Sequence, residues 1–237
     1  DQNEAYNDGG AIFIFNTVGF FKESNFSSNI NTNWNGGGAL KLESSSPIIQ
    51  NCNFSYNRTE ANHNGGAINL ESSSPTIENC TFTRNKSESN SAGALYIDSS
   101  SSPTLTDNNF YYNYASSQGG AIFAENQNFV ITGGALVGNW SGWGGAYASN
   151  GAVNSTFSDV RILGNEANKT SSANGGVAYF NTGTLGGTFI NCEISGNRAT
   201  GDGGVFYRGI NRFVNCSIVG NQAAAAGVAV LFTGEEI

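Results

Sequence analysis

Apolar residues in this chain alternate with polar ones over short segments and do not recur at helical spacing. In one stretch, Ile68 and Leu70 are followed by Ile77 and then by Cys80 and Phe82, with polar residues in between. Period-two segments of this kind predict half-buried β-strands. The segments are separated by Gly, Asn and Ser-Ser-Ser-Pro, which favour turns because they tolerate unusual backbone angles or bond to their own backbone. The pattern therefore predicts an all-β protein built from short strands.

Two sequence motifs alternate along the chain. One is a tetrapeptide of the Gly-Gly-Ala-Ile type, which begins at Gly9, Gly37, Gly65, Ala92, Gly119, Gly144, Gly175, Gly203 and Ala226. The other is Phe-x-x-Asn, or Leu/Ile-x-x-Asn, and its asparagines are Asn29, Asn57, Asn85, Asn113, Asn139, Asn165, Asn197 and Asn221. Interleaved motifs that share one period indicate a solenoid with one coil per repeat. We predict a right-handed parallel β-helix of about eight coils, each of roughly 27 residues, in which three strands per coil stack ~4.8 Å apart into three sheets.

Stacked coils place equivalent residues above one another in columns. The eight asparagines should form a ladder whose side-chain amides bond from coil to coil. Serine runs at 44–46, 72–74 and 99–102 recur at one phase of the repeat, so we expect stacked turns and not flexible linkers. A buried apolar column should contain Ile49, Ile77, Leu105, Ile131, Phe157, Phe189 and Phe213.

The pairing of GGA[ILV] with FxxN resembles the repeat of the chlamydial polymorphic outer membrane proteins. The similarity extends from Gly9 to Ala229 and includes an alanine two residues after the asparagine, at Ala115, Ala167, Ala199 and Ala223. The resemblance implies a β-helical passenger domain that is exposed on a cell surface and associated with adhesion. The high density of Asn and of glycosylation sequons is more similar to a eukaryotic secreted protein, so the source stays open.

Acidic residues occupy one phase of the repeat, immediately before the serine turns. Like charges ~4.8 Å apart repel unless something compensates them. Either the carboxylates cap the turns by accepting bonds from backbone N–H groups, or they form a cation site, for which calcium is the candidate. The residues of this acidic column are Glu43, Glu71, Asp98 and Glu125.

A second column should face outward if Leu40 and Leu42 face the core, and five of its eight positions are aromatic. Exposed aromatic side chains in a row can stack on sugars or on another protein. The alternative is ordinary stacking between coils beneath a covering loop. The candidate contact residues are Phe13, Tyr96, Phe123, Tyr179 and Tyr207.

The four cysteines form two pairs, Cys52 with Cys80 and Cys192 with Cys216, and the members of each pair share one inward position on adjacent coils. The spacing lacks a metal-binding Cys-x-x-Cys. Side chains stacked in parallel keep their Cβ atoms further apart than a disulfide prefers. Free stacked thiols are therefore favoured over bridges.

Composition restricts the compartment and the partners. A formal charge of −8 with only 10 Lys and Arg argues against nucleic acid, and no apolar run is long enough for membrane insertion. The chain contains no Met, which suggests a processed chain or a segment of a longer repeat protein or filament. Nine Asn-x-Ser/Thr sequons occur, and an extracellular or cell-surface location would allow their glycosylation. The glycosylation candidates are Asn154, Asn168, Asn25 and Asn53; sequon residues of the ladder should be unmodified.

Enzymatic function is the main alternative, because β-helices often carry polysaccharide lyases and hydrolases. The sequence shows no paired acids of the Asp-x-Asp type, and its single histidine, His63, lies in a loop without a positioned nucleophile. We therefore expect no catalytic residues and no cofactor, with calcium as the one possible exception. The expected function is a structural or adhesive surface that contacts other protein copies, receptors or glycans. Continuation of the coils in a parent chain, or end-to-end association with another copy, should cover the strand edges at both ends.

Overall fold

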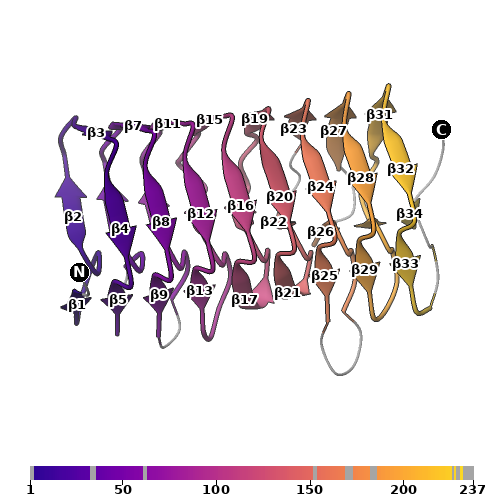
Figure 1. The fold of residues 1–237 in the computed structure, drawn as a ribbon, viewed down its shortest axis with the longest axis horizontal. Coiled ribbons are helices and arrows are strands. Elements are labelled where there is room, and N and C mark those ends of the chain that lie inside the picture. Colours follow the sequence, from indigo (N-terminus) through magenta and orange to yellow (C-terminus); the bar gives the residue numbers. More distant parts are fainter. Residues whose placement is uncertain are drawn as a thin grey trace.

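The computed structural model describes residues 3–32, 36–60, 63–151, 154–168, 173–181, 186–225, 227 and 230–231. Over these residues the chain winds into a solenoid of short parallel strands, and the residues contain no helix (Figure 1). Every strand pairs with its equivalent in each adjacent coil, and the end strands of each sheet pair on one side only. The all-β solenoid predicted from the repeat is confirmed.

Two of the sheets contain nine strands each. Sheet A consists of β1 (Glu4–Ala5), β5 (Ile30–Asn31), β9 (Arg58–Thr59), β13 (Lys86–Ser87), β17 (Tyr114–Gln118), β21 (Trp140–Trp143), β25 (Glu166–Ala167), β29 (Arg198–Ala199) and β33 (Gln222–Ala223). Sheet B consists of β2 (Ile12–Phe15), β6 (Leu40–Glu43), β10 (Ile68–Glu71), β14 (Leu95–Ile97), β18 (Ile122–Glu125), β22 (Tyr147–Asn150), β26 (Ala178–Phe180), β30 (Phe206–Tyr207) and β34 (Val230–Leu231).

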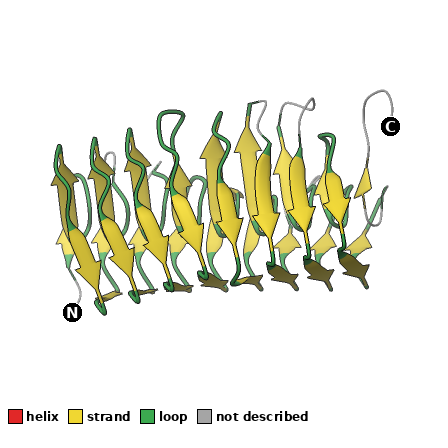
Figure 2. Ribbon diagram, turned by 90° about the horizontal axis from the view of Figure 1, so that it is seen from above, coloured by secondary structure: helices red, strands yellow, loops and turns green. Residues whose placement is uncertain are grey.

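The other two sheets contain eight strands each, and Figure 2 shows the stack from above. Sheet C consists of β3 (Phe20–Lys22), β7 (Ile48–Gln50), β11 (Thr76–Glu78), β15 (Thr104–Thr106), β19 (Val130–Thr132), β23 (Ser155–Ser158), β27 (Gly187–Ile190) and β31 (Arg212–Val214). Sheet D consists of β4 (Asn25–Ser27), β8 (Asn53–Ser55), β12 (Thr81–Thr83), β16 (Asn109–Tyr111), β20 (Ala135–Val137), β24 (Arg161–Leu163), β28 (Glu193–Ser195) and β32 (Ser217–Val219).

The expectation of three sheets was wrong, because each coil carries a fourth strand. Most strands of sheet A are only two residues long, directly after the ladder asparagine. Their inward residues are small, as in Thr59, Ser87 and Ala115, all of which are fully buried. Small inward side chains do not alternate visibly with polar ones, so the period-two pattern did not predict the strands of sheet A.

The core lies between the sheets and consists of stacked identical or similar side chains. The predicted column from Ile49 to Phe189 is buried throughout, and Phe213 in the last coil is half-buried against it. Four phenylalanines of sheet D stack with ring centroids 4.6–4.9 Å apart and planes 5° from parallel: Phe26, Phe54, Phe82 and Phe110. The repeat thus buries one continuous apolar column after another, which is what allows a chain of short strands to fold.

The asparagine ladder forms one inner edge of the stack. The Asn85 side chain donates to Asn113 Oδ1 at 3.0 Å and to the Phe54 carbonyl at 2.9 Å, and its backbone N–H also donates to Asn113 Oδ1. Equivalent side-chain bonds join each of the other neighbouring pairs in the column from Asn29 to Asn221. From Asn57 onward, each ladder side chain therefore satisfies a carbonyl and an N–H group of the preceding coil.

The Gly-Gly motif has a steric cause. A Cβ added to Gly66 would lie 2.2 Å from the Gly93 carbonyl oxygen of the next coil and 2.5 Å from Lys86 N. Gly93 and Gly120 face the same obstruction. The backbones of adjacent coils approach so closely here that only glycine fits.

The four cysteines are free thiols stacked in pairs, and the backbone N–H of Cys52 donates to Cys80 Sγ at 3.4 Å. The Cys192 and Cys216 pair repeats this contact at the same distance. Burial raises the pKa of Cys80 from 9.0 to about 12 and that of Cys192 to about 11.

These thiols should make folding stability fall in alkaline solution. An unfolded thiol ionises near its ordinary pKa, while the folded thiol stays protonated, so the free energy of unfolding should fall as pH rises from about 9 toward the folded values. Denaturant titrations from about pH 8 to about pH 11 should show this decline, and the Cys80→Ala, Cys192→Ala double variant should show a shallower one. Parallel declines in the two proteins would contradict the assignment.

Candidate functional site

The predicted acidic column lines a pocket on the outer face of sheet B. The pocket has a volume of about 410 Å³, and its walls include Glu71, Asp98, Glu125, Lys41 and Tyr96. Glu71 pairs in register with Glu43 of the preceding coil, as the repeat predicted, but Glu43 is not part of the lining. The carboxylates thus belong to a polar hollow that also contains a cation and a phenol.

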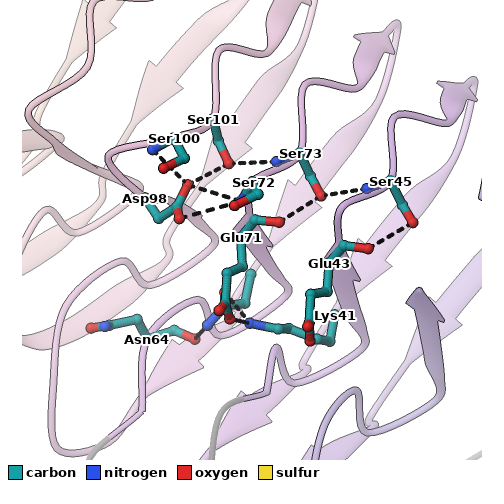
Figure 3. Close-up of polar contacts among 11 residues, drawn as sticks. Lys41, Glu43, Ser45, Asn64, Glu71, Ser72, Ser73, Asp98, Ser100 and Ser101 are labelled. Atoms are coloured by element: carbon teal, nitrogen blue, oxygen red, sulfur yellow. Dashed lines mark hydrogen bonds and ion pairs between the residues drawn. The ribbon is translucent and has the colours of Figure 1, made fainter. Parts of the chain in front are cut away.

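Lys41 compensates part of this negative charge. Its side chain is only 2% exposed, and its Nζ lies 2.5 Å from Glu71 Oε2 and 3.3 Å from Asn69 Oδ1 (Figure 3). A buried ammonium is stable only when it is paired and hydrogen-bonded in this way. The same charge, after burial itself, lowers the pKa of the half-buried His63, which also lines the pocket.

Asp98 is bonded to the serine turns. Asp98 accepts hydrogen bonds from the backbone N–H groups of Ser72 and Ser100 and from the Ser101 hydroxyl. The serine turns themselves stack, since Ser45 N donates to Ser73 Oγ at 2.9 Å and Ser73 N donates to Ser101 Oγ at 2.8 Å (Figure 3). Asp98 therefore acts as a turn cap.

Tyr96 and Glu125 also line the pocket. Burial, and then the neighbouring Glu125 carboxylate, raise the pKa of the Tyr96 hydroxyl far above its ordinary value. Within the described residues, no three His, Cys, Asp or Glu side chains converge as a metal-binding group. Of the calcium candidate column of Glu43, Glu71, Asp98 and Glu125, Glu71 is thus held in an ion pair, Asp98 caps a turn and Glu125 neighbours Tyr96.

The predicted aromatic contact face divides into a buried and an accessible part. Tyr96 is 9% exposed and Phe123 is 3% exposed, and both are buried in one cluster with Ala92 and Ala148. These two residues cannot contact a partner as expected. Phe13 is 42% exposed, and Tyr179 and Tyr207 stack half-buried with ring centroids 5.5 Å apart.

The glycosylation candidates differ in exposure. Asn154, Asn168 and Asn25 are exposed, and Asn53 is half-buried. The ladder sequons at Asn57, Asn85 and Asn139 are at most 1% exposed, and their side-chain nitrogens are bonded within the stack. Glycosylation of Asn154 and Asn168 remains our expectation.

A different set of aromatic and cationic side chains faces solvent at the corner between sheets D and A. One column occupies the position just before each ladder asparagine, and its backbone φ is positive in all eight coils. The last four coils place glycine there, whereas coils of the N-terminal half place Tyr56, Arg84 and Tyr112. Bulky residues rarely adopt this left-handed conformation, which costs roughly 1–2 kcal/mol per residue. Tyr56 and Tyr112 are nevertheless more than half exposed.

A second column lies just after the ladder asparagine, on the outer face of sheet A. Arg58, Lys86, Tyr114 and Trp140 follow one another in register across β9, β13, β17 and β21. The Tyr114 and Trp140 rings stack with centroids 4.6 Å apart, and Lys86 Nζ lies 5.5 Å from the Tyr114 centroid. Together the two columns form what we call the aromatic-cation strip, which comprises Tyr56, Arg58, Arg84, Lys86, Tyr112, Tyr114 and Trp140.

Contacts within the strip hold its side chains in place. Arg84 lies between two tyrosines, with its guanidinium carbon 5.7 Å from the Tyr56 centroid and 6.0 Å from the Tyr112 centroid. The ring of Tyr112 covers Gly138, where an added Cβ would lie 2.6 Å from it. A hollow of about 430 Å³ lies between the two columns, lined by Tyr56, Arg84 and Lys86 among others.

Sequence reasoning missed the strip although a signal was present. Listing the residue before each ladder asparagine gives Ser, Tyr, Arg and Tyr, followed by four glycines. When a repeat has glycine at one position in some coils and bulky residues at the same position in others, the bulky residues indicate a functional site. The second column of the strip lies on sheet A, which the sequence did not predict, so its residues could be aligned only once the structure was known.

No helix of the described residues is long and apolar enough to cross a membrane. No curated protein and no solved structure matches the chain. One family model does match, over residues 1–166, and it describes a right-handed β-helix region. The match covers more than half of the chain and agrees with the parallel four-sheet stack. The chain therefore belongs to the right-handed β-helix family.

Proposed function

We propose that this β-helix is a non-enzymatic extracellular or cell-surface module that binds glycans along its side. The observation that carries the proposal is the aromatic-cation strip, which spans four consecutive coils and contains the exposed Tyr56 and Tyr112 and the half-buried Tyr114 and Trp140. Exposed aromatic rings supply apolar area at a small entropic cost and stack on sugar faces. The likeness to polymorphic outer membrane protein repeats supports a surface location and an adhesive role.

The strain in the strip supports a role in binding. Glycine satisfies the positive φ of this corner in the last four coils, so the fold itself does not require Tyr56, Arg84 or Tyr112 there. Energetically unfavourable residues that persist on a surface are typical of functional sites.

The proposal is tested by binding of the protein to an array of glycans and by removal of the aromatic platform. The Tyr112→Gly, Trp140→Ala double variant should lose glycan binding by about tenfold or more, since stacking contributes roughly 1–3 kcal/mol. It should retain the cooperative unfolding of the wild type, because Gly138 already occupies the equivalent position of the next coil. Failure of the wild type to bind any glycan would refute the proposal.

A carbohydrate-active enzyme is the second candidate, and the pocket beside Lys41 is the observation that favours it. Carboxylates, a lysine, a histidine and a tyrosine line this hollow, and lyases and hydrolases use such groups. Release of reducing ends from polysaccharides by the wild type, and its loss in Glu125→Gln, would establish the enzyme. We expect no release, because Lys41 is locked to Glu71 and Asp98 caps a turn.

A further inference from the structure

We propose that the aromatic-cation strip selects linear anionic glycans, and that Arg84 is the residue that recognises their carboxylate or sulfate groups. This inference rests on the proposed function and adds the ligand class. It follows from the charge of the strip, from the way Arg84 is held, and from the spacing of the coils.

Positive charge is concentrated in the strip although the protein is acidic. The chain carries 10 Lys and Arg against 18 Asp and Glu, and Arg58, Arg84 and Lys86 lie together on this one surface. Arg58 pairs with Glu60 at 2.6 Å and Lys86 pairs with Glu88 at 3.1 Å. No ion pair of Arg84 occurs within the described part of the chain. Three cations and two carboxylates leave one net positive charge, and it belongs to Arg84.

Contacts within the strip hold the guanidinium of Arg84. Its Nη1 donates to the Tyr56 hydroxyl at 2.6 Å, and the Tyr56 and Tyr112 rings flank it in the neighbouring coils. This leaves donors of the planar fork free in an exposed side chain. A pre-organised guanidinium fork binds carboxylate and sulfate oxygens in a bidentate manner at a low entropic cost.

The spacing of the strip fits a polymer. Each coil contributes one residue to each column, and successive coils are ~4.8 Å apart, which is comparable to the length of one sugar ring in a chain. A linear glycan that lies along the stack could pack one sugar ring against the edges of the stacked Tyr114 and Trp140 rings and place an acidic group at Arg84, one to two coils away. On the other side of Arg84, the hollow that also borders Tyr56 and Arg58 leaves room for further sugars of the chain.

Titration calorimetry at low and at physiological salt provides the test. The probes are polygalacturonate and chondroitin sulfate as anionic glycans, dextran as a neutral glycan, and polyglutamate as an acidic polypeptide. We expect anionic glycans to bind at least about tenfold more tightly than dextran and polyglutamate, and their affinity to fall with salt.

Arg84→Gly should weaken binding of the anionic glycans about 10- to 100-fold and leave dextran binding unchanged. Glycine is the residue that four other coils use at this position, so the variant should fold like the wild type. The matched control is Arg161→Gln, which removes an exposed cation of sheet D that is paired with Glu193 outside the strip, and it should bind like the wild type.

The outcomes separate this inference from the proposed function. Equal binding of dextran and polygalacturonate, or an Arg84→Gly variant that binds polygalacturonate normally, would overturn the selection of anionic glycans while glycan binding itself would stand. Equal binding of polyglutamate would overturn the glycan class. Absence of binding to every glycan would refute both proposals.

Discussion

Substitution of Leu105 by Asp should abolish cooperative unfolding of the whole stack. Leu105 is 1% exposed in β15, and it lies in register between Ile77 and Ile131 of the neighbouring coils. The change removes roughly 1.5–3 kcal/mol of apolar burial and places a carboxylate where nothing can pair with it, which costs several kcal/mol more. Because each coil is stabilised only by its neighbours, failure at a central coil also exposes the coils on either side.

Thermal unfolding followed by circular dichroism checks this result. The matched control is Thr104→Asp on the same strand, since Thr104 is exposed and its neighbours Thr76 and Val130 are exposed as well. The control should melt within about 1 kcal/mol of the wild type. A Leu105→Asp protein with a wild-type transition would show that this column does not stabilise the fold.

Substitution of Asn113 by Ala should destabilise the protein by roughly 2–6 kcal/mol, because it leaves several buried groups without partners. The Asn113 side chain donates to the Phe82 carbonyl at 2.9 Å and to Asn139 Oδ1 at 3.0 Å. Its own Oδ1 accepts from the Asn85 backbone N–H at 2.9 Å and from the Asn85 side chain at 3.0 Å. Alanine removes all four bonds at a position that is 1% exposed, where water cannot replace them.

Asn109→Ala is the control for this effect, since it changes the same residue type on β16 of the same coil. Asn109 is half-buried, and its side chain accepts one bond from the Tyr111 hydroxyl at 3.2 Å. Denaturant unfolding should therefore show a loss of about 1 kcal/mol or less for this variant. Equal losses for Asn109→Ala and Asn113→Ala would mean that the ladder contributes no more than an ordinary polar surface contact.

The glycan proposals concern surface side chains that neither of these two substitutions changes. Asn113 lies between Tyr112 and Tyr114, but its side chain points into the stack and theirs face solvent. Variants of the strip should alter binding and preserve folding, whereas variants of the ladder should alter folding first. This contrast separates a surface role of the corner from a structural one.

The sequence by itself determined the solenoid, its period and most of its columns. Gly66 and Asn85 belong to motifs that recur once per coil, and in a stacked fold each such motif must lie above its copies. The inward direction of Leu105 followed from the alternation of apolar and polar residues in one strand. These features depend on local spacing alone, which is why they could be predicted.

The tertiary structure decided what covers each outer face. Tyr96 and Lys41 point away from the core in the repeat pattern, yet both are buried, because residues of connecting segments lie beside them: Ala92 packs in one cluster with Tyr96, and Asn64 lines the same pocket as Lys41. No segment among the described residues covers the corner between sheets D and A, so Tyr112 and Arg84 stay exposed there. Periodicity defines the two sides of a strand, but only the path of the connecting segments determines which outward side chains reach solvent.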